Sequence, residues 1–129
     1  MSRVPKGLVL LLGDGGVAAT SREVLEKAGF PCLQASRRHP IRPDDVASAS
    51  PVGVIQATSL GMEEADPMPF PELLEAATPS LRWAAEWIYA SETAFTRWAR
   101  GLGIPLIEGT ELFEAQAAAQ SRRFIEGCG

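Results

Sequence analysis

The segment that most constrains the fold is an apolar run that passes directly into a glycine-rich turn. Residues 8–12 read Leu-Val-Leu-Leu-Leu, and Gly13-Asp-Gly-Gly-Val-Ala18 follows at once. A run without polar alternation is typical of a parallel strand that is buried on both faces. Apolar and small residues then recur at helical spacing as far as Ala28, and Gly29 stands where helices commonly end in a left-handed turn. The segment therefore predicts strand, turn and helix.

Three positions of this turn match the pattern GxGxxA, which is typical of dinucleotide-binding loops. In that pattern the first glycine, Gly13, allows the tight turn, and the second, Gly15, lets a pyrophosphate approach the backbone. The small side chain of Ala18 permits close packing of helix on strand. The match is short, and a glycine turn that serves only the fold is the alternative interpretation.

The start of the predicted helix offers backbone N–H groups to an anion. Those of Gly15, Gly16 and Val17 would point at the ligand, and their partial positive charge binds an anion without a lysine. The carboxylate of Asp14 lies in the same loop. It would repel a pyrophosphate unless its side chain points away.

A second predicted strand, residues 30–35, is followed by Ser36-Arg37-Arg38. An acidic residue at this place, about 20 positions after the glycines, would bind the ribose hydroxyls of NAD. The chain instead has two guanidinium groups, which pair well with phosphate oxygens. The pattern therefore favours NADP over NAD, with a solvated basic turn as the alternative.

The rest of the chain continues the alternation of strands and helices. We expect a short helix over 43–49, a strand over 52–57 with a polar turn over 58–62, a helix over 71–77, a strand over 81–89, a helix capped by Ser91 that ends at Gly103, a strand over 104–107 and a final helix over about 110–126. Helical spacing also fits 81–89, but Trp83, Trp87 and Tyr89 favour a strand. The prediction is one domain, residues 1–129, with a Rossmann-like three-layer αβα sandwich and a mostly parallel sheet of about five strands.

Composition excludes several classes of function. A net charge of −4 and an isoelectric point near 5.0 argue against nucleic acid as a partner. No apolar run approaches the roughly 20 residues of a membrane span, and no secretory signal precedes the fold. Cys32 lies in a predicted strand and Cys128 near the end of the chain, which suits a reducing compartment. We therefore expect a cytoplasmic protein.

Seven segments, in order and at matching spacing, resemble the C-terminal half of shikimate dehydrogenases. They are Gly13-Asp-Gly-Gly-Val-Ala18, Ser36-Arg37-Arg38, Ile55-Gln-Ala-Thr-Ser-Leu-Gly-Met62, Glu86-Trp-Ile-Tyr89, Glu92-Thr93, Gly109-Thr-Glu-Leu112 and Gln116-Ala-Ala118. The resemblance implies a Rossmann-like NADP-binding domain. The enzymes of this family reduce 3-dehydroshikimate to shikimate by hydride transfer from NADPH, on the route to the aromatic amino acids.

The resemblance also implies roles for individual residues. The pyrophosphate would lie at Gly13, Gly15 and Gly16, and the 2′-phosphate at Ser36, Arg37 and Arg38. Thr58 and Ser59 would line the cofactor crevice, and Gly109 and Leu112 would pack by the nicotinamide. Tyr89 and Gln116 would face the substrate. Packing of Tyr89 at a strand end and solvation of Gln116 on a helix are the alternatives.

The chain departs from the family pattern at several positions. Gln56 replaces an asparagine, Glu86 replaces an aspartate, Ala90-Ser91 replaces Asn-Pro, and Glu111 replaces a glycine near the nicotinamide. The family's catalytic lysine and aspartate belong to an N-terminal domain, whereas Lys6, Lys27 and His39 of this chain match none of its motifs. The expectation is a divergent member whose substrate domain is absent from this chain and which is inactive in isolation. A non-catalytic nucleotide-sensing or interaction module and a purely structural domain are the alternatives.

A homodimer is a further expectation. Without a substrate domain the cleft face would expose Leu60, Met62, Tyr89, Leu112 and Phe113. Apolar patches of this size promote self-association.

Overall fold

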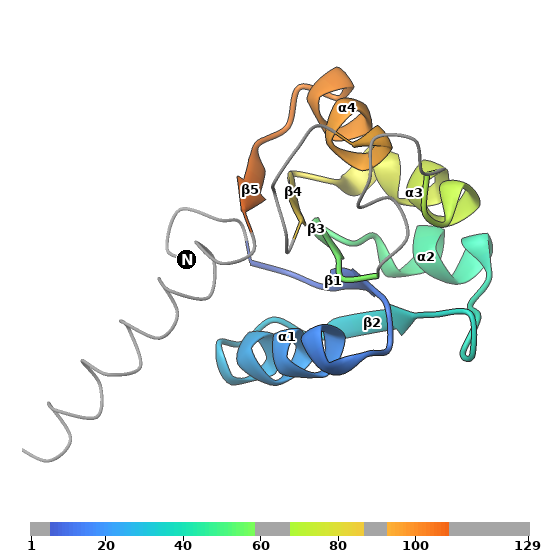
Figure 1. Cartoon of the computed structure of the whole chain (residues 1–129). Helices are drawn as coiled ribbons and strands as arrows, with labels where there is room; N and C mark the ends of the chain where they lie inside the picture. Colours follow the sequence, from blue (N-terminus) through green and yellow to red (C-terminus); the bar gives the residue numbers. More distant parts are fainter. Residues whose placement is uncertain (1–5, 59–67, 87–92, 109–129) are drawn as a thin grey trace, which may run out of the picture.

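The protein has a five-stranded, all-parallel sheet with the strand order β2-β1-β3-β4-β5 (Figure 1). The structure is a computed structural model, and it describes residues 6–58, 68–86 and 93–108. Its elements are β1 (Val9–Leu12), α1 (Gly16–Lys27), β2 (Cys32–Ala35), α2 (Pro43–Ala49), β3 (Gly53–Gln56), α3 (Pro71–Ala77), a 3-10 turn (Thr78–Ser80), β4 (Trp83–Glu86), α4 (Ala94–Gly101) and β5 (Leu106–Glu108).

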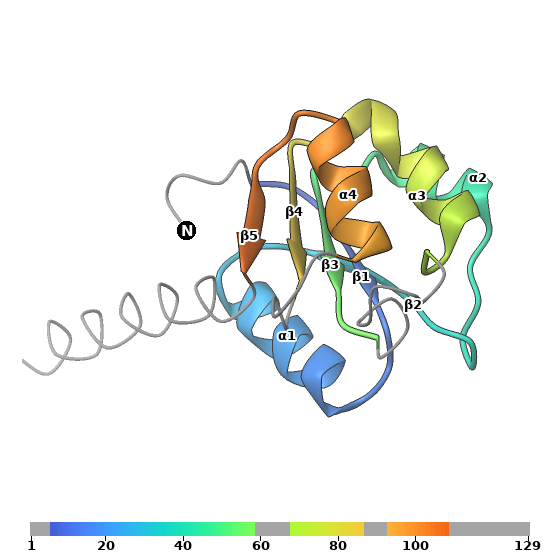
Figure 2. The ribbon, with the colours of Figure 1, turned by 45° about the horizontal axis from the view of Figure 1, so that its top comes forward.

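Helices cover both faces of the sheet. Helix α1 packs on one face, and α2, α3 and α4 lie together on the other, as the two views in Figures 1 and 2 show. The predicted Rossmann-like three-layer sandwich is therefore confirmed. The sheet contains no antiparallel pair among the described strands, because each strand is joined to the next through a segment that crosses a face of the sheet.

Strand β1 is the centre of the core. All four of its side chains are fully buried, which confirms a strand enclosed on both faces. Leu10 and Leu12 belong to the apolar cluster with α2, α3 and α4, whereas Val9 and Leu11 belong to the cluster with α1. The uninterrupted apolar run is thus explained by the two layers that pack on it.

Strand β4 settles the ambiguous segment 81–89 in favour of a strand, over Trp83–Glu86. In the parallel register Trp83 lies beside Gly53 of β3, and its indole covers the Cα atom of that glycine. A Cβ atom at position 53 would be 2.1 Å from Cε2 of Trp83. Gly53 therefore makes room for a large side chain that is only 1% exposed.

Element boundaries follow local signals in most places. Helices α2 and α3 have the predicted bounds, and each has a proline in its first turn, where no backbone donor is needed. The Ser91 cap is wrong, because α4 begins after Thr93. Thr93 accepts a hydrogen bond from the backbone of Thr96, and the Thr96 hydroxyl accepts one from the backbone of Thr93, which closes a capping box.

The last described strand lies slightly later in the chain than predicted. It spans Leu106–Glu108 rather than 104–107. Pro105 contributes only its carbonyl, which accepts from the backbone N–H of Ala84 at 2.9 Å, because proline has no N–H to donate. The final helix expected over 110–126 lies outside the described residues.

Candidate functional site

The loops after β1, β2 and β3 meet around one pocket at the carboxyl edge of the sheet. The chain leaves β1 for α1 on one face and leaves β2 for α2 on the other, so the order reverses between β1 and β3. Such a switch point is where open α/β sheets bind ligands. The pocket has a volume of about 410 Å³ and is lined by Gly13, Asp14, Gly15, Ser36, Arg37, Arg38, Ala57, Thr58 and Phe70. It brings together the glycine loop and the arginine turn.

Gly13 is fixed from three sides. Its N–H donates to the carbonyl of Ala35 at 2.8 Å, and its carbonyl accepts from Nε2 of Gln34 at 2.8 Å. Its φ of +125° suits glycine, and a Cβ atom there would lie 2.8 Å from the carbonyl oxygen of Ala57. Gln34 in turn accepts from Arg22 of α1 at 2.9 Å. The sequence pattern explained the glycine but not these supporting side chains.

The N-terminus of α1 opens toward the pocket without a side-chain cap. Gly15 is the N-cap residue with extended backbone, and the first turn contains no acidic residue. A Cβ atom at Gly15 or Gly16 would meet nothing within 4 Å. These two glycines are therefore not required by packing within the described protein. Their N–H groups and that of Val17 carry the partial positive charge of the helix end.

Asp14 faces an arginine from the neighbouring loop. Its Oδ2 atom lies 3.8 Å from Nε of Arg38, and the two side chains are 34% and 85% exposed. An ion pair this exposed contributes about 1 kcal/mol or less. The carboxylate is thus in the pocket wall, but Arg38 offsets its charge.

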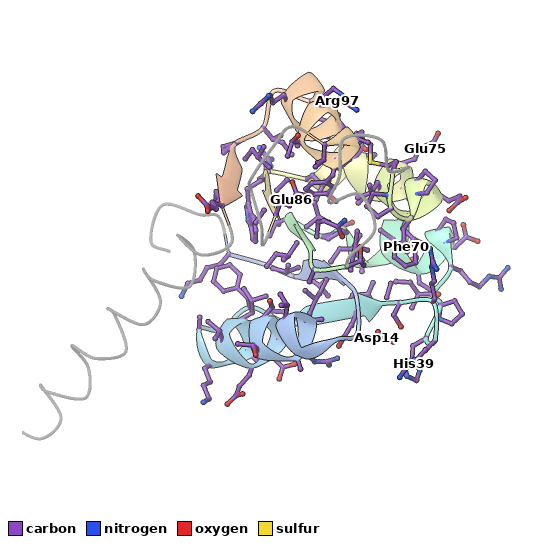
Figure 3. The ribbon with its side chains drawn as sticks, in the orientation of Figure 1. Asp14, His39, Phe70, Glu75, Glu86 and Arg97 are labelled. Atoms are coloured by element: carbon purple, nitrogen blue, oxygen red, sulfur yellow. The ribbon has the colours of Figure 1, made fainter. Side chains whose placement is uncertain are left out.

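A tight turn after β2 presents the two arginines. The backbone of Ser36 donates to the carbonyl of His39 at 3.2 Å, and the backbone of His39 donates to the Ser36 hydroxyl at 3.0 Å. Ser36 is 3% exposed, whereas Arg37, Arg38 and His39 are exposed. The buried serine holds the turn, and the guanidinium groups project from it. Figure 3 shows His39 and Asp14 on adjacent loops.

Gln56, one of the departures from the family pattern, holds Thr58 at the pocket. The backbone N–H and the hydroxyl of Thr58 both donate to Oε1 of Gln56, at 3.2 and 2.8 Å. Gln56 ends β3 and is 1% exposed. A buried amide therefore orients the polar turn that follows β3.

Glu86 ends the neighbouring strand β4, directly beside Gln56 in the register. It is 1% exposed and accepts a hydrogen bond from the hydroxyl of Thr93 at 3.3 Å. Burial raises the pKa of Glu86 from 4.5 to about 7, and the hydrogen bond from Thr93 opposes this in part. Glu86 does not line the pocket. Its carboxyl connects the end of β4 to the start of α4 through the hydrogen bond from Thr93 (Figure 3).

Phe70 lines the pocket but was not predicted from the sequence. It precedes α3 and lies on the α2 and α3 side of the sheet (Figure 3). Its φ of +44° is rare for an aromatic residue. The proline-rich stretch around it carries no periodic pattern that marks one side chain as functional.

Five predicted site residues lie outside the described residues: Ser59, Tyr89, Gly109, Leu112 and Gln116. The same holds for Leu60, Met62 and Phe113 of the expected dimer face. Within residues 6–58, 68–86 and 93–108, no group of three His, Cys, Asp or Glu side chains is placed to hold a metal ion. None of the helices in these ranges is long and apolar enough to cross a membrane.

Comparison with known proteins identifies the fold. No protein-family model and no curated protein matches the sequence. Among solved structures, shikimate dehydrogenase 1 from Peptoclostridium difficile superposes with a TM-score of 0.65 at 17% identity, over 95% of this chain and 48% of that one. A chorismate mutase/shikimate 5-dehydrogenase fusion protein from Clostridium acetobutylicum gives 0.60 at 23% identity, over 95% and 48%. Shikimate dehydrogenase from Thermotoga maritima gives 0.59 at 22% identity, over 90% and 50%.

This chain therefore spans about half the length of each of these three structures. Identities this low establish shared architecture rather than shared chemistry. The protein has a shikimate dehydrogenase-like, Rossmann-like fold.

Proposed function

We propose that this chain is the NADP-binding domain of a shikimate dehydrogenase-like oxidoreductase that reduces 3-dehydroshikimate to shikimate in chorismate biosynthesis. The observation that carries the proposal is a single pocket at the switch point that joins the Gly13–Gly15 loop to the Ser36–Arg38 turn. The fold and the charge of the pocket support the same ligand class. NADPH supplies the hydride when it is bound.

The residues present fit a dinucleotide phosphate. The open space at Gly15 and Gly16 lets a pyrophosphate reach the uncapped N-terminus of α1, where a side chain at either position would intrude. Arg37 and Arg38 would hold the 2′-phosphate, because guanidinium groups form paired hydrogen bonds with phosphate oxygens. Thr58, oriented by Gln56, would line the crevice toward the nicotinamide.

Substrate binding and proton transfer are assigned in this proposal to a second domain. The described part of the chain brings no lysine–aspartate pair to the pocket. Tyr89 and Gln116 would contact the substrate from this side. We therefore expect a cytoplasmic protein whose isolated chain binds NADPH but does not reduce 3-dehydroshikimate. We also expect it to form a homodimer through the cleft face, which sedimentation analysis would detect.

A non-catalytic nucleotide-sensing module is the second candidate, and the Asp14–Arg38 contact favours it. The pairing of Asp14 with Arg38 lowers the positive charge that the pocket offers to a phosphate, as expected of a degenerate nucleotide site. The full-length reading frame separates the two candidates. An adjoining domain with a lysine and an aspartate in the family's motifs supports the enzyme and rejects the sensor.

Arginine substitution tests the cofactor assignment. Arg37→Ala should weaken NADPH binding by about tenfold or more and leave NADH binding nearly unchanged, because a hydrogen bond to a charged group contributes about 1.5–3 kcal/mol. Arg97→Ala is the matched control, since Arg97 is exposed on α4, away from the pocket (Figure 3). Equal NADPH affinity in wild type and Arg37→Ala, measured by isothermal titration calorimetry, would reject the 2′-phosphate site.

A further inference from the structure

Phe70 has a backbone conformation that the start of a helix does not need. It is the N-cap residue of α3 with φ +44° and ψ +57°, whereas N-cap residues are normally extended. The next residue is Pro71, which further restricts the backbone of the residue before it. Among the described residues, the other non-glycine residue with positive φ is Ser50, at the C-terminal end of α2, where this conformation is common. Strain of this kind persists where surrounding structure enforces it and is concentrated at ligand sites.

Hydrogen bonds hold the backbone of Phe70, and its side chain packs against a neighbouring apolar cluster. The Phe70 carbonyl accepts from the backbone of Leu73 and of Leu74, both at 3.1 Å. The side chain packs against the apolar cluster under α3 and is half-buried, so one part of it remains at the pocket. The residue with the unusual backbone is thus also the residue that contributes an aromatic side chain to the pocket lining.

The residues that line the pocket include groups suited to bind anions and, among those described, a single aromatic side chain. In the proposed function, the N-terminus of α1 at Gly15 would bind the pyrophosphate, and Arg37 and Arg38 would bind the 2′-phosphate. Phe70 is the one aromatic residue among the described lining residues. In a 2′-phosphorylated adenosine, the base is bonded to the same ribose that carries the phosphate. A base whose 2′-phosphate is held by the arginines must therefore lie within one sugar ring of them.

We propose that Phe70 binds the adenine ring of the dinucleotide by stacking at this end of the site. The inference rests on the proposed function, since it needs a dinucleotide in the pocket. The chemical basis is general: every base has a π-face, and aromatic side chains stack on it. The strained backbone then acts as a fixed support for the ring.

Two substitutions and three probes test this assignment. Phe70→Leu keeps an apolar side chain for the packing under α3 but removes the aromatic face, whereas Phe70→Tyr keeps both. Phe70→Leu should weaken binding of NADPH and of 2′,5′-ADP by about tenfold or more, and Phe70→Tyr by about twofold or less. Inorganic pyrophosphate has no base, so its affinity should be the same in all three proteins. Melting temperatures establish that the variants are folded.

A spectroscopic measurement on the wild-type protein does not depend on any variant. Stacking on Phe70 predicts an upfield shift of the adenine H2 and H8 resonances of 2′,5′-ADP on binding. Wild-type affinity for 2′,5′-ADP without that shift, or unchanged nucleotide affinity in Phe70→Leu, overturns the stacking assignment and leaves the proposed function intact. An equal loss of pyrophosphate binding in Phe70→Leu also overturns it. Failure of the wild type to bind NADPH and 2′,5′-ADP rejects the proposed function itself.

Discussion

The buried carboxyl of Glu86 should make the stability of the fold depend on pH. Glu86 is 1% exposed and has no cation among the partners described, only the Thr93 hydroxyl. Burial disfavours its charged form, so its folded-state pKa is about 7 against 4.5 for the ordinary group. The folded protein thus binds the proton more tightly than the unfolded chain does. Its contribution to stability is complete below pH 4.5 and is lost as the pH rises to about 7.

The magnitude follows from the same two pKa values. At about 1.4 kcal/mol per tenfold change in proton affinity, the rise from 4.5 to about 7 corresponds to roughly 3 kcal/mol of the free energy of unfolding. Glu86→Gln has the shape of the protonated side chain and no charge. The variant should therefore resemble the wild type near pH 4 and be more stable by about 3 kcal/mol above pH 7.

Urea denaturation between pH 4 and pH 8 measures this difference directly. Glu108→Gln is the matched control, because Glu108 occupies the same row of the sheet on β5 but is exposed. The control should follow the wild-type pH dependence. A Glu86→Gln variant that is less stable than the wild type at pH 8, or that has the same pH dependence, would refute the reasoning.

Other predictions concern the glycines and the α4 cap. Gly13→Ala should destabilise the fold by about 3 kcal/mol or more, because its Cβ atom would clash with the backbone of Ala57 just after β3. Gly15→Ala should keep the wild-type melting temperature but lose NADPH affinity. A stable Gly13→Ala variant together with a destabilised Gly15→Ala variant would contradict the roles assigned to the two glycines. Gly53→Ala should unfold at a lower urea concentration than the wild type, and adding Trp83→Leu should restore part of the lost stability, since the clash is with the indole. A double variant no more stable than Gly53→Ala would argue against that contact. Thr93→Val should lower the free energy of unfolding by about 1 kcal/mol or more, because it removes the cap of α4 and the hydrogen bond to Glu86. An unchanged melting temperature would contradict that role.

The sequence predicted the layers of the fold because the buried strands and the proline-started helices carry local signals. The run in β1 is apolar for its whole length because both of its faces are covered. Pro43 and Pro71 mark helix starts that the structure reproduces. The strand at Trp83–Glu86 was harder to predict, since its spacing also fits a helix. Its decisive partner, Gly53, is distant in sequence and visible only once the register is known.

The sequence predicted that the glycine loop and the arginine turn lie together, but not the side chains that support them. Gly13 and Arg37 occupy the same pocket, as the motifs indicate. The support of the glycine turn by Gln34 depends on a hydrogen bond between β2 and the loop after β1, which no local pattern encodes. Phe70 was missed because its place in the pocket depends on a rare backbone conformation. The cap was placed at Ser91 in error because serine and threonine both favour the N-cap position, and Thr93, two residues further along, closes the capping box.

The affinity of the wild-type chain for NADPH relative to NADH tests the central claim most directly. Calorimetric titration of both nucleotides at low and at physiological salt gives the preference and its ionic component. The account predicts that NADPH binds at least about tenfold more tightly, because Arg37 and Arg38 face the pocket and no acidic residue follows β2 directly. A chain that binds neither nucleotide, or that prefers NADH, would contradict it.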